Sequence, residues 1–429
     1  MKILFATMQF GRGYSQGTER YLSLLSAALR ARGHETIFLA GDPEHRGPAA
    51  KLGELIQESP NVLACPSHGW MTVRGTPAGS YARLLADLKP DLVHVANPGH
   101  IGVGILEGAT QASIPTVVSV VDFWWLCPKH TMHHYQGGIC KGEVSASQCL
   151  HCIAASHESG MLRAIANVPL VRAVALPTLM FGRSLARGLP VAEIGLWQRR
   201  REATLAAMSR ANAVIFLSKT ARALLEPRLS GPRLHQIQNG LEARWFAPSS
   251  IGERAKPTKS DSLVIGYAGA LAPHKGVHTL LEAVSLLGWS RTTVRIAAAA
   301  ESSAYSATLR KLAAGLHVDF VGRVAADAMP DFLDQLDVLV VPSMWPENVP
   351  MAVLEAFARR KTVIASRMPG IAELFADASL LFEPGSARGL SDCLRRWLGR
   401  VDSPEMPRAR TADEMVADTF RVYDEICRA

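Results

Sequence analysis

The sequence predicts an α/β protein with two domains, each built around a parallel β-sheet. At 429 residues the chain is longer than one compact core normally supports, and it carries no repeat or low-complexity tract. Short apolar runs alternate with amphipathic segments in both halves, which is typical of buried strands covered by helices. A glycine-rich turn follows the first apolar run of each half, at residues 11–17 and 266–276. Such turns let the backbone approach a ligand closely.

The composition limits the class of partner. The formal net charge is +8, which suits phosphorylated substrates, nucleic acid or an acidic membrane face. No basic stripe is interleaved with aromatic residues, so we expect no nucleic-acid partner. Residues 1–8 have the pattern of a strand rather than a signal peptide, and no apolar run approaches the ~20 residues that span a bilayer. The cysteine count of seven is odd, so a disulfide framework is not expected and we predict a cytoplasmic protein.

The first domain is expected to span residues 1–245. His94 stands inside an apolar run, which favours a satisfied core residue over a ligand. The expected strands are residues 2–8, 36–40, 92–96, 117–121 and 213–217, and the expected helices are residues 18–31, 80–88 and 101–112.

Residues 122–152 form a cysteine- and histidine-rich insertion in this domain. Cys149 and Cys152 make a Cys-x-x-Cys pair, and Cys127 and Cys140 precede them. Four cysteines in so short a segment, the last two at chelating spacing, fit a structural zinc site. The alternatives are four buried free thiols or a redox pair. The segment also offers substitute ligands, namely His130, His133, His134 and His151.

Residues 161–210 are expected to be helical, with a basic cluster at residues 199–201. A basic amphipathic helix can lie on an anionic membrane surface. The two interpretations are peripheral contact with the inner face of the membrane and an ordinary packed helix with a solvated face. Residues 246–262 are rich in Pro, Ser and Lys without an apolar period, which indicates a linker.

The second domain is expected at residues 263–405. Lys275 follows Gly269 in the glycine-rich turn and stands at the start of a helix, where its ammonium group would be a point charge for a phosphate. The alternative is a solvated surface lysine. The expected strands of this domain are residues 263–267, 294–298, 318–321, 338–341 and 362–365.

Two glutamates flank the start of a helix that follows the valine-rich run at residues 338–341. We expect that helix to begin near Pro350, because proline at a first helical position loses no hydrogen bond. Glu347 precedes the helix and Glu355 lies within it. A helix N-terminus can hold a phosphate. Carboxylates on both sides of that phosphate would suit a nucleotide sugar, although solvated helix-end glutamates are the alternative.

The residues around these glutamates resemble the signature of the retaining glycosyltransferases of family 4. In that signature a Glu preceded by Pro is followed, after seven residues, by Glu-Ala-x-Ala. Here the matching residues are Pro346, Glu347, Glu355, Ala356 and Ala358.

Three more stretches are similar to that family. The piece Gly17-Thr18-Glu19 resembles the entry to its first helix, Lys275-Gly276 resembles its diphosphate loop, and residues 369–373 resemble the turn that closes over the donor. The resemblance implies the GT-B fold, with two Rossmann-like parallel-sheet domains facing a cleft. It also implies that a terminal helix, within residues 406–429, returns to the first domain.

This resemblance implies a retaining transfer of a sugar from a nucleoside-diphosphate sugar to a glycan or lipid-linked acceptor. The expected catalytic residues are Glu347, Lys275 and Asp122, where Asp122 is the polar residue nearest to a family histidine that is replaced here by Val121. The chain contains no Asp-x-Asp motif, so no catalytic metal is expected. The expected donor-binding residues are Gly17, Gly269, His274, Lys275, Arg323, Asn348, Val349, Pro350 and Glu355.

A second departure from the family pattern is Ala270, which stands where the family often has Arg. His274 or Arg323 are the candidates for the missing charge. The alternatives on the same fold are a nucleotide-sugar epimerase or hydrolase, and a catalytically silent subunit that binds a nucleotide sugar.

Overall fold

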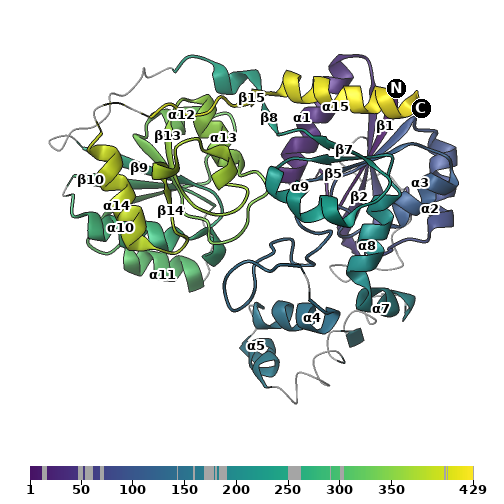
Figure 1. Cartoon of the computed structure of the whole chain (residues 1–429), viewed down its shortest axis with the longest axis horizontal. Coiled ribbons are helices and arrows are strands. Elements are labelled where there is room, and N and C mark those ends of the chain that lie inside the picture. Colours follow the sequence, from purple (N-terminus) through teal and green to yellow (C-terminus); the bar gives the residue numbers. More distant parts are fainter. Residues whose placement is uncertain are drawn as a thin grey trace. The chain divides into compact units, whose positions relative to one another are not determined.

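The chain folds into two compact units in the computed structural model (Figure 1). Unit 1 comprises Met1–Asn239 and Asp413–Ala429, and unit 2 comprises Gly240–Ala412. The structure describes residues 1–11, 17–46, 52–53, 61–67, 72–142, 144–157, 160–168, 178, 181–182, 191–249, 262–289, 291–299, 304–400, 402 and 404–428.

Unit 1 is built on a parallel sheet with the strand order β3-β2-β1-β4-β5-β6-β7. Leu4 and Ala6 of β1 pack into a core with Tyr81, whereas Phe5 points to the opposite face and stacks on Phe38. Both faces are therefore buried, as is usual for parallel sheets. The strands are β1 (Lys2–Thr7), β2 (Glu35–Arg46), β3 (Val62–Ser67), β4 (Leu92–Val95), β5 (Thr116–Val120), β6 (Ala213–Phe216) and β7 (Arg233–Gln236).

The helices of unit 1 connect these strands, and the last of them comes from the end of the chain. They are α1 (Gly17–Ala31), α2 (Ala78–Leu88), α3 (Gly104–Gln111), α4 (Ala146–Ala155), α5 (Gly160–Asn167), α7 (Val191–Gln198), α8 (Arg200–Ser209), α9 (Lys219–Leu225) and α15 (Ala412–Cys427).

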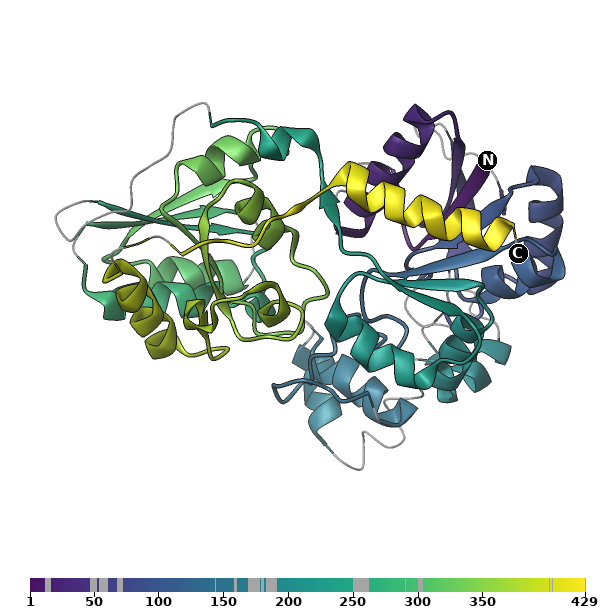
Figure 2. The same ribbon diagram turned by 45° about the horizontal axis from the view of Figure 1, so that its top comes forward.

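A buried hydrogen-bond network fastens α15 to unit 1, along which the helix runs in both ribbon views (Figures 1 and 2). The two ring nitrogens of His94 contact the hydroxyls of Tyr423 and Ser119, and Tyr21 also reaches Ser119 at 2.9 Å. Burial lowers the pKa of His94 to about 3, so this histidine is neutral at pH 7. His94 is the satisfied core residue that its apolar strand predicts.

Unit 2 is built on a second parallel sheet, with the order β11-β10-β9-β12-β13-β14. Val338 and Val340 of β12 pack into one core, and Leu339 and Val341 pack into another on the opposite face. The strands are β9 (Leu263–Ala268), β10 (Thr292–Ala297), β11 (His317–Gly322), β12 (Val338–Val341), β13 (Thr362–Ser366) and β14 (Leu381–Phe382). The helices are α10 (Val277–Leu287), α11 (Ala304–Leu312), α12 (Met329–Asp334), α13 (Met351–Ala358) and α14 (Ala387–Leu398).

The α/β class with two parallel sheets is confirmed, and a few details differ from expectation. The units divide at residue 239 instead of residue 245, because β8 (Gly240–Leu241) pairs with β15 (Arg410–Thr411) inside unit 2. Strand β3 was not predicted. Residues 250–261 of the expected linker and much of the expected basic helical stretch, residues 161–210, lie outside the described residues. Within the part of the chain that is described, no helix combines the length and the apolarity needed to cross a bilayer.

Each sheet has a point where its strand order reverses direction. In unit 1 this point lies between β1 and β4, and in unit 2 it lies between β9 and β12. The loops that leave the carboxyl ends of two such strands diverge to opposite faces, which leaves a crevice where α/β proteins bind ligands. Gly17 follows β1, Lys275 follows β9 and Glu347 follows β12. The candidate Asp122 follows β5, the strand next to β4.

Candidate functional site

Three loops of unit 2 meet at the carboxyl edge of its sheet, beside the point where the strand order reverses. They are residues 269–276 after β9, residues 342–350 after β12 and residues 367–371 after β13. The backbone N–H of Met344 donates to the carbonyl of His274 at 2.7 Å, and the N–H of Glu347 donates to the carbonyl of Pro369 at 3.2 Å. The three loops thus form one connected surface.

Two glycines allow these loops to approach each other. Gly276 has φ +73°, and a Cβ there would lie 1.9 Å from the carbonyl oxygen of Pro342. Gly370 has φ +81°, and a Cβ there would lie 1.6 Å from the carbonyl oxygen of Glu347. Any side chain at either position would force the loops apart, because both the space and the backbone conformation exclude it.

The carboxylate of Glu347 is the centre of this surface. Its Oε1 accepts hydrogen bonds from Lys275 Nζ at 2.6 Å, Trp345 Nε1 at 2.8 Å and Ser343 Oγ at 2.9 Å. Burial alone would raise the pKa of Glu347, but the charge of Lys275 and these three hydrogen bonds outweigh it and lower the pKa below its ordinary value. Glu347 is therefore a buried carboxylate that stays ionised at neutral pH.

Lys275 is held on two sides. Its ammonium group forms an ion pair with Glu347 and lies 4.6 Å from the centre of the Trp345 ring. The His274 ring packs edge-on against the same indole, with 4.6 Å between the ring centres. The lysine belongs to a short 3-10 turn, Pro273–Lys275, and Gly276 caps α10, so Lys275 precedes the helix instead of opening it. Neither Trp345 nor Ser343 was expected at the site from the sequence.

Helix α13 begins directly after the Glu347 loop. It starts at Met351 with Pro350 as the N-cap, one residue later than expected, and Pro350 has no side-chain oxygen to cap the helix. Asn348 and Pro350 are buried, and Val349 is half-buried. Glu355 is buried in the second turn of the helix, eight residues after Glu347.

Two other expected donor residues lie farther along the same edge of the sheet. Gly269 follows β9, and a Cβ there would come within 2.8 Å of the Tyr267 hydroxyl. Arg323 is exposed and follows β11. Strand β10 lies between β11 and β9, so these two strands are about 10 Å apart.

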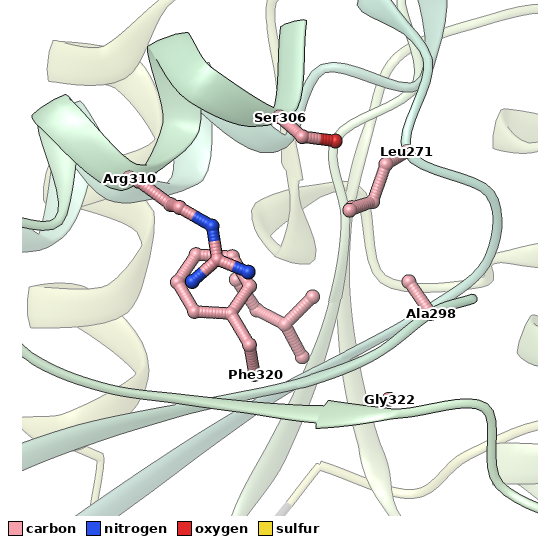
Figure 3. A pocket seen from close by; sticks show the side chains of 7 residues that line it. Leu271, Ala298, Ser306, Arg310, Phe320 and Gly322 are labelled. Carbon is pink, nitrogen blue, oxygen red and sulfur yellow. The ribbon is translucent and has the colours of Figure 1, made fainter. Parts of the chain in front are cut away.

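A small pocket of about 60 Å³ lies between these two ends of the edge (Figure 3). Leu271 comes from the β9 loop, and Arg310 on α11 extends its guanidinium group over the Phe320 ring, 5.2 Å from the ring centre. The other lining residues are Ile296, Ala298, Ser306 and Gly322. The pocket combines an apolar floor with one cation.

The remaining expected site residues belong to unit 1. Gly17 opens α1, where a Cβ would meet no other atom within 4 Å, and the preceding loop, residues 12–16, lies outside the described residues. Asp122 follows β5 and accepts hydrogen bonds from Asn97 Nδ2 and from the backbone N–H of Trp124. His130 Nδ1 lies 3.2 Å from Asp122 Oδ2. Asn97 and His130 were not predicted as its partners.

All four cysteines of the insertion are free thiols of intermediate exposure. Among the residues that the structure describes, no three side chains of His, Cys, Asp or Glu are placed, as they stand, to hold a metal ion. The expected ligands are Cys127, Cys140, Cys149 and Cys152.

Two protein-family models match the chain, one in each unit. The model described as "Glycosyltransferase Family 4" matches residues 15–142, and the model described as "Glycosyl transferases group 1" matches residues 251–412. The second match contains the three loops around Glu347.

Two curated relatives of this chain are sugar transferases. A lipopolysaccharide 1,2-N-acetylglucosaminetransferase of Salmonella typhimurium is 27% identical over 43% of this chain and 52% of its own length. A GDP-mannose-dependent α-mannosyltransferase of Mycobacterium tuberculosis is 24% identical over 59% of this chain and 51% of its own length. The matched part of this chain thus spans about half of each relative.

Two solved structures share the fold of nearly the whole chain. The sucrose-phosphate synthase of Thermosynechococcus elongatus has a TM-score of 0.61 at 15% identity, covering 99% of this chain and 98% of its own. Anabaena Alr3699/HepE, solved in complex with UDP and glucose, has a TM-score of 0.61 at 16% identity and covers 99% of both chains.

Proposed function

This chain belongs to the family 4 glycosyltransferases and has their GT-B fold, and from this premise we propose that it transfers a sugar from a nucleoside-diphosphate sugar to a hydroxyl group of an acceptor. The observation that carries the proposal is the meeting of Lys275, Glu347 and the start of α13 at one reversal point of the unit 2 sheet. The solved complex of a fold neighbour with UDP and glucose supports a donor of this class.

The departing diphosphate is the group that this surface would bind. Its negative charge grows as the sugar–oxygen bond breaks, so a fixed cation and a helix N-terminus stabilise the transition state more than the ground state. Lys275 supplies the cation and α13 supplies the helix end. Because no Asp-x-Asp motif is present, we propose that these protein groups take the place of a catalytic metal.

The two glutamates have different tasks in this proposal. Glu355, in the second turn of α13, accepts hydrogen bonds from the ribose hydroxyls, and Glu347 holds Lys275 and the hydroxyls of the transferred sugar. The nucleoside base would stack at the mouth of the pocket of Figure 3, where the Phe320 ring and the Arg310 guanidinium group offer stacking surfaces. The same loop contributes to the pocket and carries the lysine, because Leu271 and Lys275 both lie between β9 and α10.

We further propose that transfer retains the anomeric configuration. Glu347 is engaged by three donors through Oε1, including an ion pair with Lys275, which suits an orienting group rather than a covalent nucleophile. The leaving phosphate would take the acceptor proton on the same face of the sugar. A glycan or lipid-linked acceptor is supported by the names of two relatives, one of which refers to lipopolysaccharide and the other to teichuronic acid biosynthesis.

The proposal is tested by incubating the purified protein with UDP- and GDP-sugars and a set of glycan acceptors in the presence of a chelator. We expect release of nucleoside diphosphate together with an elongated acceptor whose new bond keeps the donor's anomeric configuration by NMR. Free sugar as the sole product would identify a hydrolase. Binding of the donor without any turnover across the acceptor set would favour a silent binding subunit.

A further inference from the structure

The four cysteines of the insertion come from three pieces of chain that fold against one another. Cys127 ends a turn after β5, where its N–H donates to the carbonyl of Phe123 at 2.8 Å. Cys140 ends a tight hairpin that is closed by the pairing of His133 with Ile139, and its N–H donates to the carbonyl of Met132 at 2.7 Å. The other two cysteines lie on α4, one helical turn apart.

Side-chain contacts draw these three pieces together. Cys127 and Cys140 both pack against the apolar core under the insertion. The Cys152 thiol lies 3.8 Å from the carbonyl of His133, which attaches α4 to the hairpin. The thiol of Cys149 lies within electrostatic reach of the thiols of Cys127, Cys140 and Cys152. The four reduced cysteines, which are up to 25 residues apart in sequence, therefore lie in one part of the insertion.

Two cations stand beside this cluster. Arg200 is only 5% exposed and interacts electrostatically with Cys127 and Cys149. Its Nη2 donates to the carbonyl of Trp124, but within the described part of the chain its Nε and Nη1 are buried without a hydrogen-bond partner. Lys129 Nζ lies 3.6 Å from the Cys152 sulfur. Nearby Asp122 also attracts Arg200, yet that carboxylate is already engaged by Asn97 and His130.

Among the described residues, two nitrogens of this buried guanidinium group lack a hydrogen-bond acceptor, which favours a negative partner, because a buried donor without an acceptor is costly. Four cysteine thiolates around one zinc ion carry a net charge of −2, which Arg200 and Lys129 would balance. N–H groups that point at ligand sulfurs are the usual outer partners of such a centre. A disulfide between any two of the cysteines would be neutral and would leave Nε and Nη1 of Arg200 without an acceptor within the described structure.

We propose that Cys127, Cys140, Cys149 and Cys152 bind one structural zinc ion, with Arg200 and Lys129 as its charge-balancing outer partners. The insertion packs into the core of unit 1 through residues 123–126 and Met132, and its remainder is rich in loops. It contains one regular helix, α4, whose own apolar cluster is small, with Leu150 and Ala154 as its buried members on that helix. Short loop-rich segments of this kind are commonly held by a metal or a disulfide. Zinc binding would draw the thiols the remaining distance into a tetrahedron.

The test is the metal content of the full-length protein purified without chelators. We expect about one zinc per chain, released when a mercurial reagent titrates the thiols. Replacement by cobalt should produce sulfur-to-cobalt charge-transfer absorption and the visible bands of a tetrahedral site. Protein grown with zinc that contains only trace zinc, or that contains iron instead, overturns the proposal.

Matched variants separate the site from the other cysteines. Cys149→His keeps a metal ligand, so it should retain zinc and shift the cobalt spectrum. Cys149→Ser should lose the bound zinc. Cys427→Ser, in the exposed last turn of α15, should keep full zinc content. Arg200→Met keeps an unbranched apolar stem but removes the charge and the N–H donors, and it should weaken zinc binding by about 10–100-fold in competition with a chelator. Equal zinc loss in Cys427→Ser and Cys149→Ser, or unchanged zinc affinity in Arg200→Met, contradicts the assignment.

Discussion

Replacing Lys275 with methionine separates what this lysine does for the fold from what it does for the reaction. In the folded protein its ammonium group lies 2.6 Å from Glu347, and the two side chains are 23% and 10% exposed. Breaking a fully buried pair costs about 3–5 kcal/mol. Because this pair is partly exposed, we expect Lys275→Met to lower the free energy of unfolding by about 1–3 kcal/mol. For a unit of this size, each kcal/mol corresponds to about 2–4 °C in melting temperature.

The loss of activity in Lys275→Met should be larger than this loss of stability implies. Removing one preorganised group that stabilises a developing anion usually lowers kcat about 10²–10³-fold. We expect kcat/KM for sugar transfer to fall by this factor at a temperature where the variant remains fully folded. The assay measures nucleoside diphosphate released in the presence of acceptor, and differential scanning calorimetry verifies folding.

The double variant Lys275→Met with Glu347→Gln decides between the two roles. A glutamine at 347 carries no charge and can still accept hydrogen bonds from Ser343 and Trp345, so stability should return toward that of the parent protein. Activity should stay low, because the cation for the diphosphate is still missing. If the double variant regains both stability and transfer, Lys275 serves only to neutralise Glu347 and the proposed diphosphate contact is wrong.

Three other outcomes follow from the structure. The pKa of His94 is about 3 in the folded protein and has its ordinary value of 6.5 in the unfolded chain. Between pH 6.5 and pH 3, His94 is therefore protonated in the unfolded chain but not in the folded protein. The free energy of unfolding should therefore fall by about 1.4 kcal/mol for each unit of decreasing pH in that window. In urea unfolding, His94→Gln should make this pH dependence weaker. An unchanged pH dependence would show that other groups cause it. Gly370→Ala would place a Cβ 1.6 Å from the Glu347 carbonyl oxygen and should abolish transfer. The control is Gly288→Ala, because Gly288 also has a positive φ but has open space around its Cβ position. Equal transfer activity of the two variants would contradict the packing argument. Glu355→Gln should weaken a ribonucleotide donor about 10-fold or more and a 2′,3′-dideoxy donor little, and an equal loss for both would remove Glu355 from the ribose.

The sequence predicted those parts of the fold whose signal is local. Residues 338–341 read as a buried strand because both faces of β12 pack into apolar cores, and this strand is confirmed within its expected bounds. β3 (Val62–Ser67) went unpredicted because its short run contains Cys65 and Pro66, which weaken the β pattern. The first segment of unit 1 ends at Asn239, six residues before the expected boundary, for a different reason. It depends on pairing between Gly240–Leu241 and Arg410–Thr411, which no local pattern reveals.

The site was predictable only as far as the family signature extended. Glu347 and Lys275 are 72 residues apart, and resemblance rather than periodicity named them together. Trp345 and Ser343 were missed because a loop without regular structure decides where their donors point. His130 was considered only as a zinc ligand, whereas its ring lies against Asp122. Arg323 was named as a substitute cation from its position after a glycine, and the sheet order places it two strands away from β9.

The most direct test of the central claim is a crystal structure of the protein with a nucleoside diphosphate, grown in the presence of a chelator. We expect a phosphate oxygen within about 3.2 Å of Lys275 Nζ, the diphosphate at the start of α13, and the ribose hydroxyls on Glu355. A diphosphate bound away from Lys275, or bound only when a divalent cation is supplied, would contradict the claim.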